Sequence, residues 1–140
     1  MVGAGSYVSK SNAFETDILK YIFNAIDVAA LGTFYISLHM ANPGETGDQT
    51  TSEANYTPYA RQAVLRDATG WTVTGNTANP TAVITFPRCT NGSNVITHFG
   101  IGNALNGAGY LFFYGTVSPN LTVVTGQTPL LMTTSSITED

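Results

Sequence analysis

The amino-acid sequence predicts a mainly β fold, a jelly-roll-like antiparallel β-sandwich of about eight strands with one N-terminal helix. Beyond Gly32, apolar and polar residues alternate with a period of two, which is typical of half-buried strands. The strand-like segments are short, are bounded by Gly, Pro, Asn or Asp, and recur at intervals of roughly ten residues, as in sandwiches and barrels. The 140 residues contain no linker-like tract, so we expect one domain with one core.

The N-terminal part is expected to consist of an arm and a helix. Residues 1–11 are rich in Gly and Ser and indicate a flexible arm. Asn12, followed three residues later by Glu15, resembles a capping box, and apolar residues at helical spacing continue from it. We therefore divide the chain into a flexible arm, residues 1–11, and a single jelly-roll-like domain, residues 12–140, which includes a helix at residues 12–29.

The first strand is expected at residues 33–40. Alternate residues would there face the core and the outside, with Phe34, Ile36, Leu38 and Met40 on one face and Tyr35, Ser37 and His39 on the other. Seven further segments are strand-like and end at turn-forming residues: residues 59–67, 70–75, 81–87, 94–102, 109–117, 120–126 and 130–138.

A long polar connection separates the first two of these strands, at residues 42–59. Loops beyond about 12 residues are usually functional or disordered, and Tyr is favoured at protein interfaces, so we expect this loop to wrap onto a neighbouring molecule. The alternative is that its tyrosines anchor the loop to the protein's own core. The residues expected at a capsid or dimer contact come from the arm, the loop and the loop's end: Tyr7, Pro43, Glu45, Asp48, Tyr56, Tyr59 and Arg61.

The composition argues against nucleic acids and membranes as partners. Charged residues make up only 10% of the chain, its net charge is −4, and its five Lys and Arg residues never cluster. Binding to a phosphate backbone requires a basic face, so we expect no direct nucleic-acid contact. No apolar run is long enough to cross a membrane, and no secretory signal is visible, so we expect neither insertion nor secretion.

Two histidines and three loop acids are the candidates for a metal site. His39 and His98 lie on expected strands and could share an ion with Glu45, Asp48 or Glu53. Their spacing matches no zinc or calcium motif, so we interpret both histidines as polar residues on the outer face of a sheet and expect no metal.

The sequence offers no recognisable catalytic group. No serine lies in a nucleophile motif, and three acids in one loop cannot flank a sugar as glycosidase chemistry requires. Residues 102–109 contain several glycines but lack the ending of a phosphate loop and are interpreted as a hairpin turn. Cys89, the chain's one cysteine, is expected to be a small buried apolar residue. We expect no enzyme and no cofactor.

Four blocks of sequence resemble a family of tailed-bacteriophage virion proteins. They are FYISLHMANPGETGDQTTSEANYTPYARQAV at residues 34–64, and the segments 70–76, 84–100 and 109–115, which occur in the same order as in that family. The resemblance covers roughly residues 33 to 125. Related domains are often labelled tail fibre proteins. A short chain consisting of little but this domain resembles capsid cement (decoration) proteins of the Bordetella bacteriophage kind.

This resemblance implies a structural protein of the virion, made in the host cytoplasm and located on the capsid exterior. It implies a jelly-roll domain that forms a homodimer, binds the phage major capsid protein and cements neighbouring subunits to stabilise the head. One alternative is a tail fibre or receptor-binding module of the same phage. A second alternative is a small lectin-like carbohydrate-binding domain.

Overall fold

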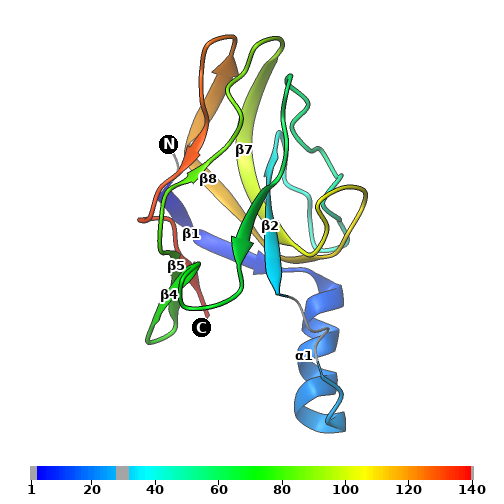
Figure 1. The fold of residues 1–140 in the computed structure, drawn as a ribbon. Helices are drawn as coiled ribbons and strands as arrows, with labels where there is room; N and C mark the ends of the chain where they lie inside the picture. Colours follow the sequence, from blue (N-terminus) through cyan, green and yellow to red (C-terminus); the bar gives the residue numbers. More distant parts are fainter. Residues whose placement is uncertain (1–2, 28–31, 140) are drawn as a thin grey trace.

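The computed structural model describes residues 3–27 and 32–139 (Figure 1). Within these residues, one helix and ten strands follow one another: β1 (Gly3–Lys10), α1 (Asn12–Asn24), β2 (Thr33–His39), β3 (Gln62–Leu65), β4 (Trp71–Thr74), β5 (Thr77–Pro80), β6 (Ile84–Thr85), β7 (Ser93–Gly102), β8 (Leu111–Val124), β9 (Leu130–Leu131) and β10 (Ile137–Thr138).

All strand pairs are antiparallel and form three sheets. The largest sheet has the order β1-β8-β7-β2-β3, a second has the order β10-β5-β4, and β6 pairs with β9. The longest pairing joins β7 to β8, from Ser93↔Val124 to Gly102↔Leu111. The predicted mainly β, sandwich-like fold is therefore confirmed, whereas the jelly-roll connectivity stays a prediction.

The core lies on the inner face of the largest sheet and beneath the segments that cross it. Ile36 and Leu38 of β2 are buried as the period-two pattern predicts. Cys89 is also buried, as expected, and its backbone carbonyl accepts from the Gly126 N–H. The buried cluster contains thirteen residues: Ile36, Leu38, Ala54, Tyr56, Ile84, Phe86, Cys89, Ile96, Phe99, Ile101, Val117, Val123 and Leu131.

The N-terminal segment differs from the expectation. Residues 3–10, expected to belong to a flexible arm, form β1, which pairs with β8 from Gly3↔Ser118 to Lys10↔Phe113. The pairing shifts in register between Ala4 and Val8. Backbone hydrogen bonds to a neighbouring strand create this element, so a composition rich in Gly and Ser does not reveal it.

The helix begins at the predicted residue and ends earlier than predicted. Its N-cap is Ser11, one residue before the predicted capping box, and the Ser11 hydroxyl oxygen accepts from the Phe14 backbone N–H at 3.2 Å. Its end is Asn24 rather than residue 29, because Ala25 adopts a left-handed conformation and bonds back to the Lys20 carbonyl. The expected last residues, 28 and 29, lie outside the described residues.

Two predicted strands form one continuous strand, and β5, like β1, was not predicted. The segments expected at residues 109–117 and 120–126 are parts of the continuous β8, which runs through Pro119. β5, at residues 77–80, lies where a turn was expected and forms a tight hairpin with β4. The segment expected at residues 130–138 forms two short strands, β9 and β10, in different sheets.

Candidate functional site

The predicted contact loop folds back onto the body of the protein. The Ala54 N–H donates to the Leu38 carbonyl, and the Met40 N–H donates to the Ser52 carbonyl, each at 2.8 Å. Gln49 is fully buried, and its side chain donates to the Tyr35 carbonyl at 3.1 Å. The loop therefore covers the outer face of β2 instead of extending freely into solvent.

Most of the expected contact residues of this loop are buried or hydrogen-bonded within the protein itself. Pro43 and Tyr56 are buried, and burial raises the pKa of Tyr56 to about 12. Asp48 is half-buried and accepts from the Thr50 hydroxyl and backbone N–H, which lowers its pKa. Glu45 is exposed, and its backbone carbonyl accepts from the Asn12 N–H at the base of α1.

Tyr59, Arg61 and Glu53 form a buried polar network. Arg61 Nε and Nη2 donate to the two carboxylate oxygens of Glu53 at 2.7 and 2.8 Å, and the Tyr59 hydroxyl donates to Glu53 Oε1. Desolvation opposes the charge on Arg61, but the hydrogen bonds and charge of Glu53 outweigh it and raise the pKa of Arg61. Burial and the nearby Glu53 raise the pKa of Tyr59 well above its ordinary value. These side chains hold the loop together, so their role as contacts to another molecule stays untested.

Tyr7 belongs to β1 by its backbone, and its side chain lies outside the described part of the chain. It was expected at the same contact as the loop residues. The structure places β1 on the edge of the largest sheet, whereas the loop lies over β2, so the backbone of Tyr7 and the loop belong to different parts of the sheet.

The two histidines lie opposite one another on β2 and β7. Both were expected on the outer face of a sheet, and for His39 this expectation is wrong. His39 is 0% exposed, and its Nδ1 and Nε2 atoms lie 2.8 Å from the Thr51 carbonyl and the Ser37 hydroxyl. His98 is half-buried and contacts Thr97. Burial lowers the pKa of both imidazoles. Among residues 3–27 and 32–139, no group of three or more His, Cys, Asp or Glu residues is placed to hold a metal ion.

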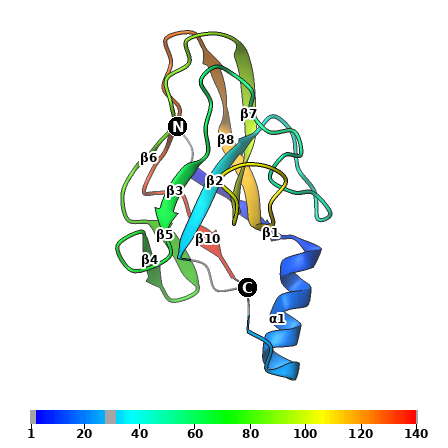
Figure 2. The ribbon, with the colours of Figure 1, turned by 45° about the vertical axis from the view of Figure 1, so that its right-hand side comes forward.

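Helix α1 projects from the body and is fixed to it at one end. Figures 1 and 2 show it extending away from the sheets. Phe14 packs edge-on against Phe112 and Phe113, with ring centroids 5.1 Å apart in each case. The Tyr110 hydroxyl donates to Asp17 at 2.9 Å, and the Ser11 hydroxyl bonds to the Leu111 carbonyl. These contacts involve only the first turns of the helix.

The rest of α1 exposes large apolar side chains to solvent. No residue of the helix is buried, and Phe23 and Ile22 are 76% and 63% exposed. Leu19, Ile22 and Phe23 stand at i, i+3 and i+4, so they share one face of the helix. Ile26, just beyond the cap, is also exposed. We call these four residues the apolar stripe of α1. A surface of this kind is typical of a contact with another protein.

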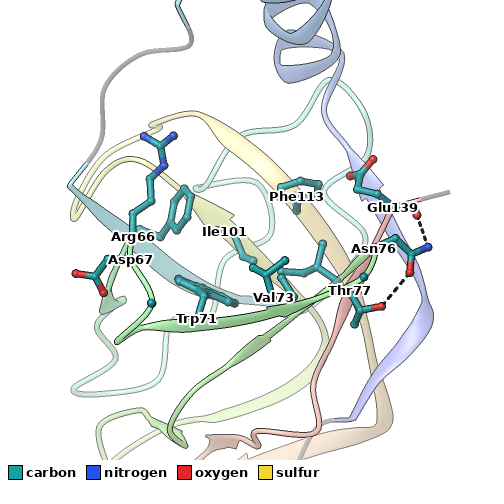
Figure 3. A pocket seen from close by; sticks show the side chains of 14 residues that line it. Arg66, Asp67, Trp71, Val73, Asn76, Thr77, Ile101, Phe113 and Glu139 are labelled. Carbon is teal, nitrogen blue, oxygen red and sulfur yellow. Dashed lines mark hydrogen bonds between the residues drawn. The ribbon is translucent and has the colours of Figure 1, made fainter.

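A second apolar surface is a cleft of about 710 Å³ between β4, β5 and β10 on one side and the large sheet on the other. Figure 3 shows Trp71 and Val73 of β4 facing Ile101 and Phe113, with Arg66 and Asp67 at one end and Asn76 and Glu139 at the other. We call this the Trp71 cleft. It is lined by Phe34, Arg66, Asp67, Ala68, Trp71, Val73, Gly75, Asn76, Thr77, Ala78, Ile101, Phe113, Ile137 and Glu139.

Trp71 carries a buried hydrogen-bond donor, its Nε1–H, that has no partner among the described residues. Its ring packs edge-on against Phe34 at 6.0 Å, and the Arg66 guanidinium lies 6.0 Å from the Phe34 ring centroid. A buried indole N–H normally finds a partner, so this unpaired donor is an exception within the protein's own interior.

Sequence reasoning did not identify either apolar surface. The helical spacing of the apolar residues in α1 was visible, but the same spacing is produced by a helix that packs on its own core. Trp71 lies in the strand expected at residues 70–75 and was not among the expected contact residues. The signal that could have drawn attention to the cleft is the lone Trp between turn residues, on a strand too short to cover it.

Among the described residues, no helix is long and apolar enough to span a membrane. No curated protein sequence matches the chain. The family model described as "Podophage GP4 fiber I protein gp80" matches residues 9–138, which include α1 and all strands from β2 to β10. The chain therefore belongs to the podophage GP4 fiber I protein gp80 family and is a structural protein of a bacteriophage virion.

Proposed function

We propose that this protein binds the outside of the icosahedral capsid and cements neighbouring major capsid proteins. Membership of a phage structural family supports the virion role, and the resemblance to capsid cement proteins favours the capsid location. The role is purely structural and includes no catalytic step. The Ser37–His39 pair, which has the atoms of a nucleophile and a base, is fully buried and is out of reach of any substrate.

The exposed apolar stripe of α1 is the observation that carries the proposal. Full burial of one large apolar side chain contributes about 1.5–3 kcal/mol, so covering four of them would provide several kcal/mol of binding free energy. The body gives this helix a fixed base through Phe14 and Asp17. A rigid β body that presents an apolar helix is suited to holding another protein in place.

Cementing follows from mass action. A protein that binds only the assembled shell lowers the free energy of that shell and leaves free subunits unaffected. A cement protein that forms a homodimer engages two neighbouring subunits at once, so two weak contacts act together as a strong one. We accordingly propose the major capsid protein and a second copy of the chain as its partners.

The alternative is that the protein is part of a virion fibre. The description of the matching family, which names a fiber protein, favours this second candidate. A fibre module would use the same apolar helix to attach to the virion, but its attachment point would lie elsewhere on the particle. The two candidates therefore differ in location rather than in the chemistry of the contact.

Immunogold labelling of intact virions distinguishes the two candidates. The cement proposal expects label over the whole head surface, whereas a fibre component gives label only at discrete projections or at the tail. In a second measurement, purified protein is added to empty shells that lack it. We expect saturation at a fixed ratio to the major capsid protein and a higher shell melting temperature. Absence of both effects, with label confined to fibres, would rule out the cement role.

A further inference from the structure

The largest sheet ends in a strand that pairs on one side only. β3 is the last strand in the order β1-β8-β7-β2-β3, and among the described strands it pairs with β2 alone. Beyond it lies a groove of about 280 Å³, lined by β3, by Thr69 and Gly70, and by residues 82–85, which include β6. We call this the β3–β6 groove. In Figure 2, β3 lies between β2 and the segment that contains β6.

We propose that an extended, uncharged segment of the major capsid protein enters the β3–β6 groove and adds a strand to the largest sheet. The inference deepens the proposed function and rests on it, because it names the part of the β body that holds the capsid protein. It uses a surface separate from the apolar stripe of α1, so it adds a second point of attachment.

The pairing of β2 with β3 decides which backbone groups of β3 face the groove. In an antiparallel pair, opposite residues alternate between pairs that exchange two hydrogen bonds and pairs that exchange none. The Arg66 N–H donates to the Gly32 carbonyl, and this contact continues the β2–β3 register, so Val64 also bonds to β2. The N–H and C=O groups of Ala63 and Leu65 therefore point away from β2, toward the groove.

The opposite wall presents backbone groups in the same way. The Phe86 N–H donates to the Pro129 carbonyl, in register with the β6–β9 pair Ile84↔Leu131. Thr85 lies between these two bonded positions, so its N–H and C=O point away from β9. A strand placed between β3 and β6 can therefore form hydrogen bonds on both of its sides.

The backbone groups that face the groove have no partner within the protein. Over residues 3–27 and 32–139, no hydrogen bond joins the backbone of Ala63, Leu65 or Thr85 to another group on the groove side. Alternating N–H and C=O groups along an edge are matched by another extended backbone, as in peptide binding by strand addition. β3 has four residues, so the added segment pairs over about four residues, or roughly 13 Å.

The side chains at the groove indicate the character of the added segment. Leu65 and Val83 line the groove and are 53% and 42% exposed. None of the described residues that line it is charged, so a charged side chain seated there would lose water without gaining an opposite charge. A segment with apolar or hydroxyl side chains therefore fits.

The edge also lacks the features that normally prevent strand addition. Proteins usually protect a free edge with Lys, Pro or a bulge. β3, with the sequence QAVL, contains neither Lys nor Pro, and its pairing with β2 has no register shift. The edge is thus open to pairing in the free protein.

Residue-resolved hydrogen exchange compares the free protein with the protein bound to empty shells. We expect the amides of Ala63, Leu65 and Thr85 to exchange at least about tenfold more slowly on the shell, because the added strand accepts from them. The Val64 amide, which already bonds to β2, is the internal reference and should change little. The same measurement on intact virions shows whether the edge is occupied in the particle.

A proline substitution tests the edge by binding. Ala63→Pro removes the N–H that faces the groove and leaves the pairing with β2 intact, so we expect about tenfold or weaker binding to shells. Val73→Pro is the matched control. The Thr81 N–H donates to the Gly70 carbonyl in register with the β4–β5 hairpin, so the Val73 N–H also points outward from a free edge, but outside the groove. This control should bind within about twofold of the unaltered protein.

A charge substitution provides a second test that does not alter the backbone. Leu65→Lys places a charge at the groove and should weaken shell binding by about tenfold or more. Leu105→Lys changes a residue of the same type and similar exposure, 51%, outside the groove and should leave binding unchanged. Thermal melts of all four variants confirm that each is folded.

The outcomes separate this inference from the cement role. If shells are bound, the three amides stay unprotected and both edge variants bind like the unaltered protein, the inference is overturned and the cement role stands. Protection that rises with the concentration of free protein would assign the edge to a second copy and would overturn it as well. If shells are not bound but the amides are protected in virions, the cement role and the capsid segment fail together, whereas strand addition at β3 stands.

Discussion

Gly100 of β7 illustrates how closely the backbone packs against the buried polar residues of β2. A Cβ atom at this position would lie 2.7 Å from the Ser37 hydroxyl oxygen and 2.8 Å from His39 Nε2. Both of those side chains are fully buried and hydrogen-bonded to one another, so neither has room to move away. The position therefore requires the absence of a side chain.

Gly100→Ala is expected to lower the free energy of unfolding by about 1–3 kcal/mol, because it overpacks the core. Chemical denaturation monitored by Trp71 fluorescence measures the change. Gly32→Ala is the matched control, since nothing lies within 4 Å of a Cβ there, and its effect should remain within about 0.5 kcal/mol. Equal effects of the two substitutions would contradict the close packing at Gly100.

The protonation state of His39 follows from its two neighbours. The Thr51 carbonyl can only accept, so His39 Nδ1 carries the proton, and Nε2 accepts from the Ser37 hydroxyl. Burial lowers the pKa of this imidazole, so the folded protein holds it neutral at pH values where the unfolded chain, with a His pKa of about 6.5, is protonated. Acidification below about pH 6.5 therefore favours unfolding.

His39→Gln should reduce this pH dependence. In the unaltered protein, the contribution of His39 to the free energy of unfolding falls with decreasing pH by up to about 1.4 kcal/mol per pH unit below about pH 6.5. We expect the variant to have a shallower slope over that range, whatever its stability at pH 8. Denaturation curves between pH 8 and pH 5 measure it, and His98→Gln, at a half-buried position, should change the slope less. An unchanged slope in His39→Gln would contradict the assignment.

The burial of His39 could not be predicted from residue pattern. The alternation in residues 33–40 correctly placed Ile36 and Leu38 in the core, but it assigned Ser37 and His39 to an outer face. That face is covered by a loop whose own residues are polar, with Gln49 and Thr51 bonded to β2. A period of two distinguishes the faces of a strand and does not show what lies over each face.

At the scale of elements, Arg61 connects two loops. Besides Glu53, it donates from Nη1 to the Ala104 carbonyl at 2.8 Å and from Nη2 to the Gly107 carbonyl at 2.7 Å. One buried guanidinium thus fixes the segment after β2 and the turn between β7 and β8. Its five donors in a rigid fork explain why Arg, rather than Lys, suits this position.

Arg61→Met is expected to lower the free energy of unfolding by about 3–5 kcal/mol, because it leaves the Glu53 carboxylate without its counter-charge. Thermal and chemical denaturation measure the loss. The double variant Glu53→Gln/Arg61→Met should be less destabilised than Arg61→Met alone, since no unpaired charge remains. Lys10→Met, which removes the exposed pair with Glu139, should cost less than about 1 kcal/mol. A similar cost for both pairs would contradict the role of burial.

The elements that the sequence predicted best are those with strong alternation and clear boundaries. The expected segment 94–102 corresponds to β7, and the start of α1 at Asn12 agrees with its local signals. β1 and β5 were missed because backbone pairing with β8 and β4, rather than apolar alternation, defines them. The early end of α1 depends on a left-handed Ala25, a conformation that few sequences signal without Gly.

At the scale of the whole molecule, stability is expected to be unevenly distributed. β7 and β8 lie in the middle of the largest sheet and pair along most of their length. α1 has no buried residue, and an isolated helix of 13 residues is marginally stable in water. The body and the helix therefore differ in how readily their backbone hydrogen bonds open.

Hydrogen exchange followed by mass spectrometry tests this distribution. In dilute protein we expect the amides of α1 beyond Ile18 to exchange within seconds to minutes, whereas those of β7 and β8 persist for hours or longer. Equal protection of α1 and β7 in dilute protein would show that the helix is stabilised by the body alone.

The exposed apolar face of α1 has a consequence for the infected cell. Until a partner covers them, Leu19, Ile22 and Phe23 remain in contact with water, and exposed apolar patches promote nonspecific association. Copies made in excess of the available partner would therefore be the first to aggregate.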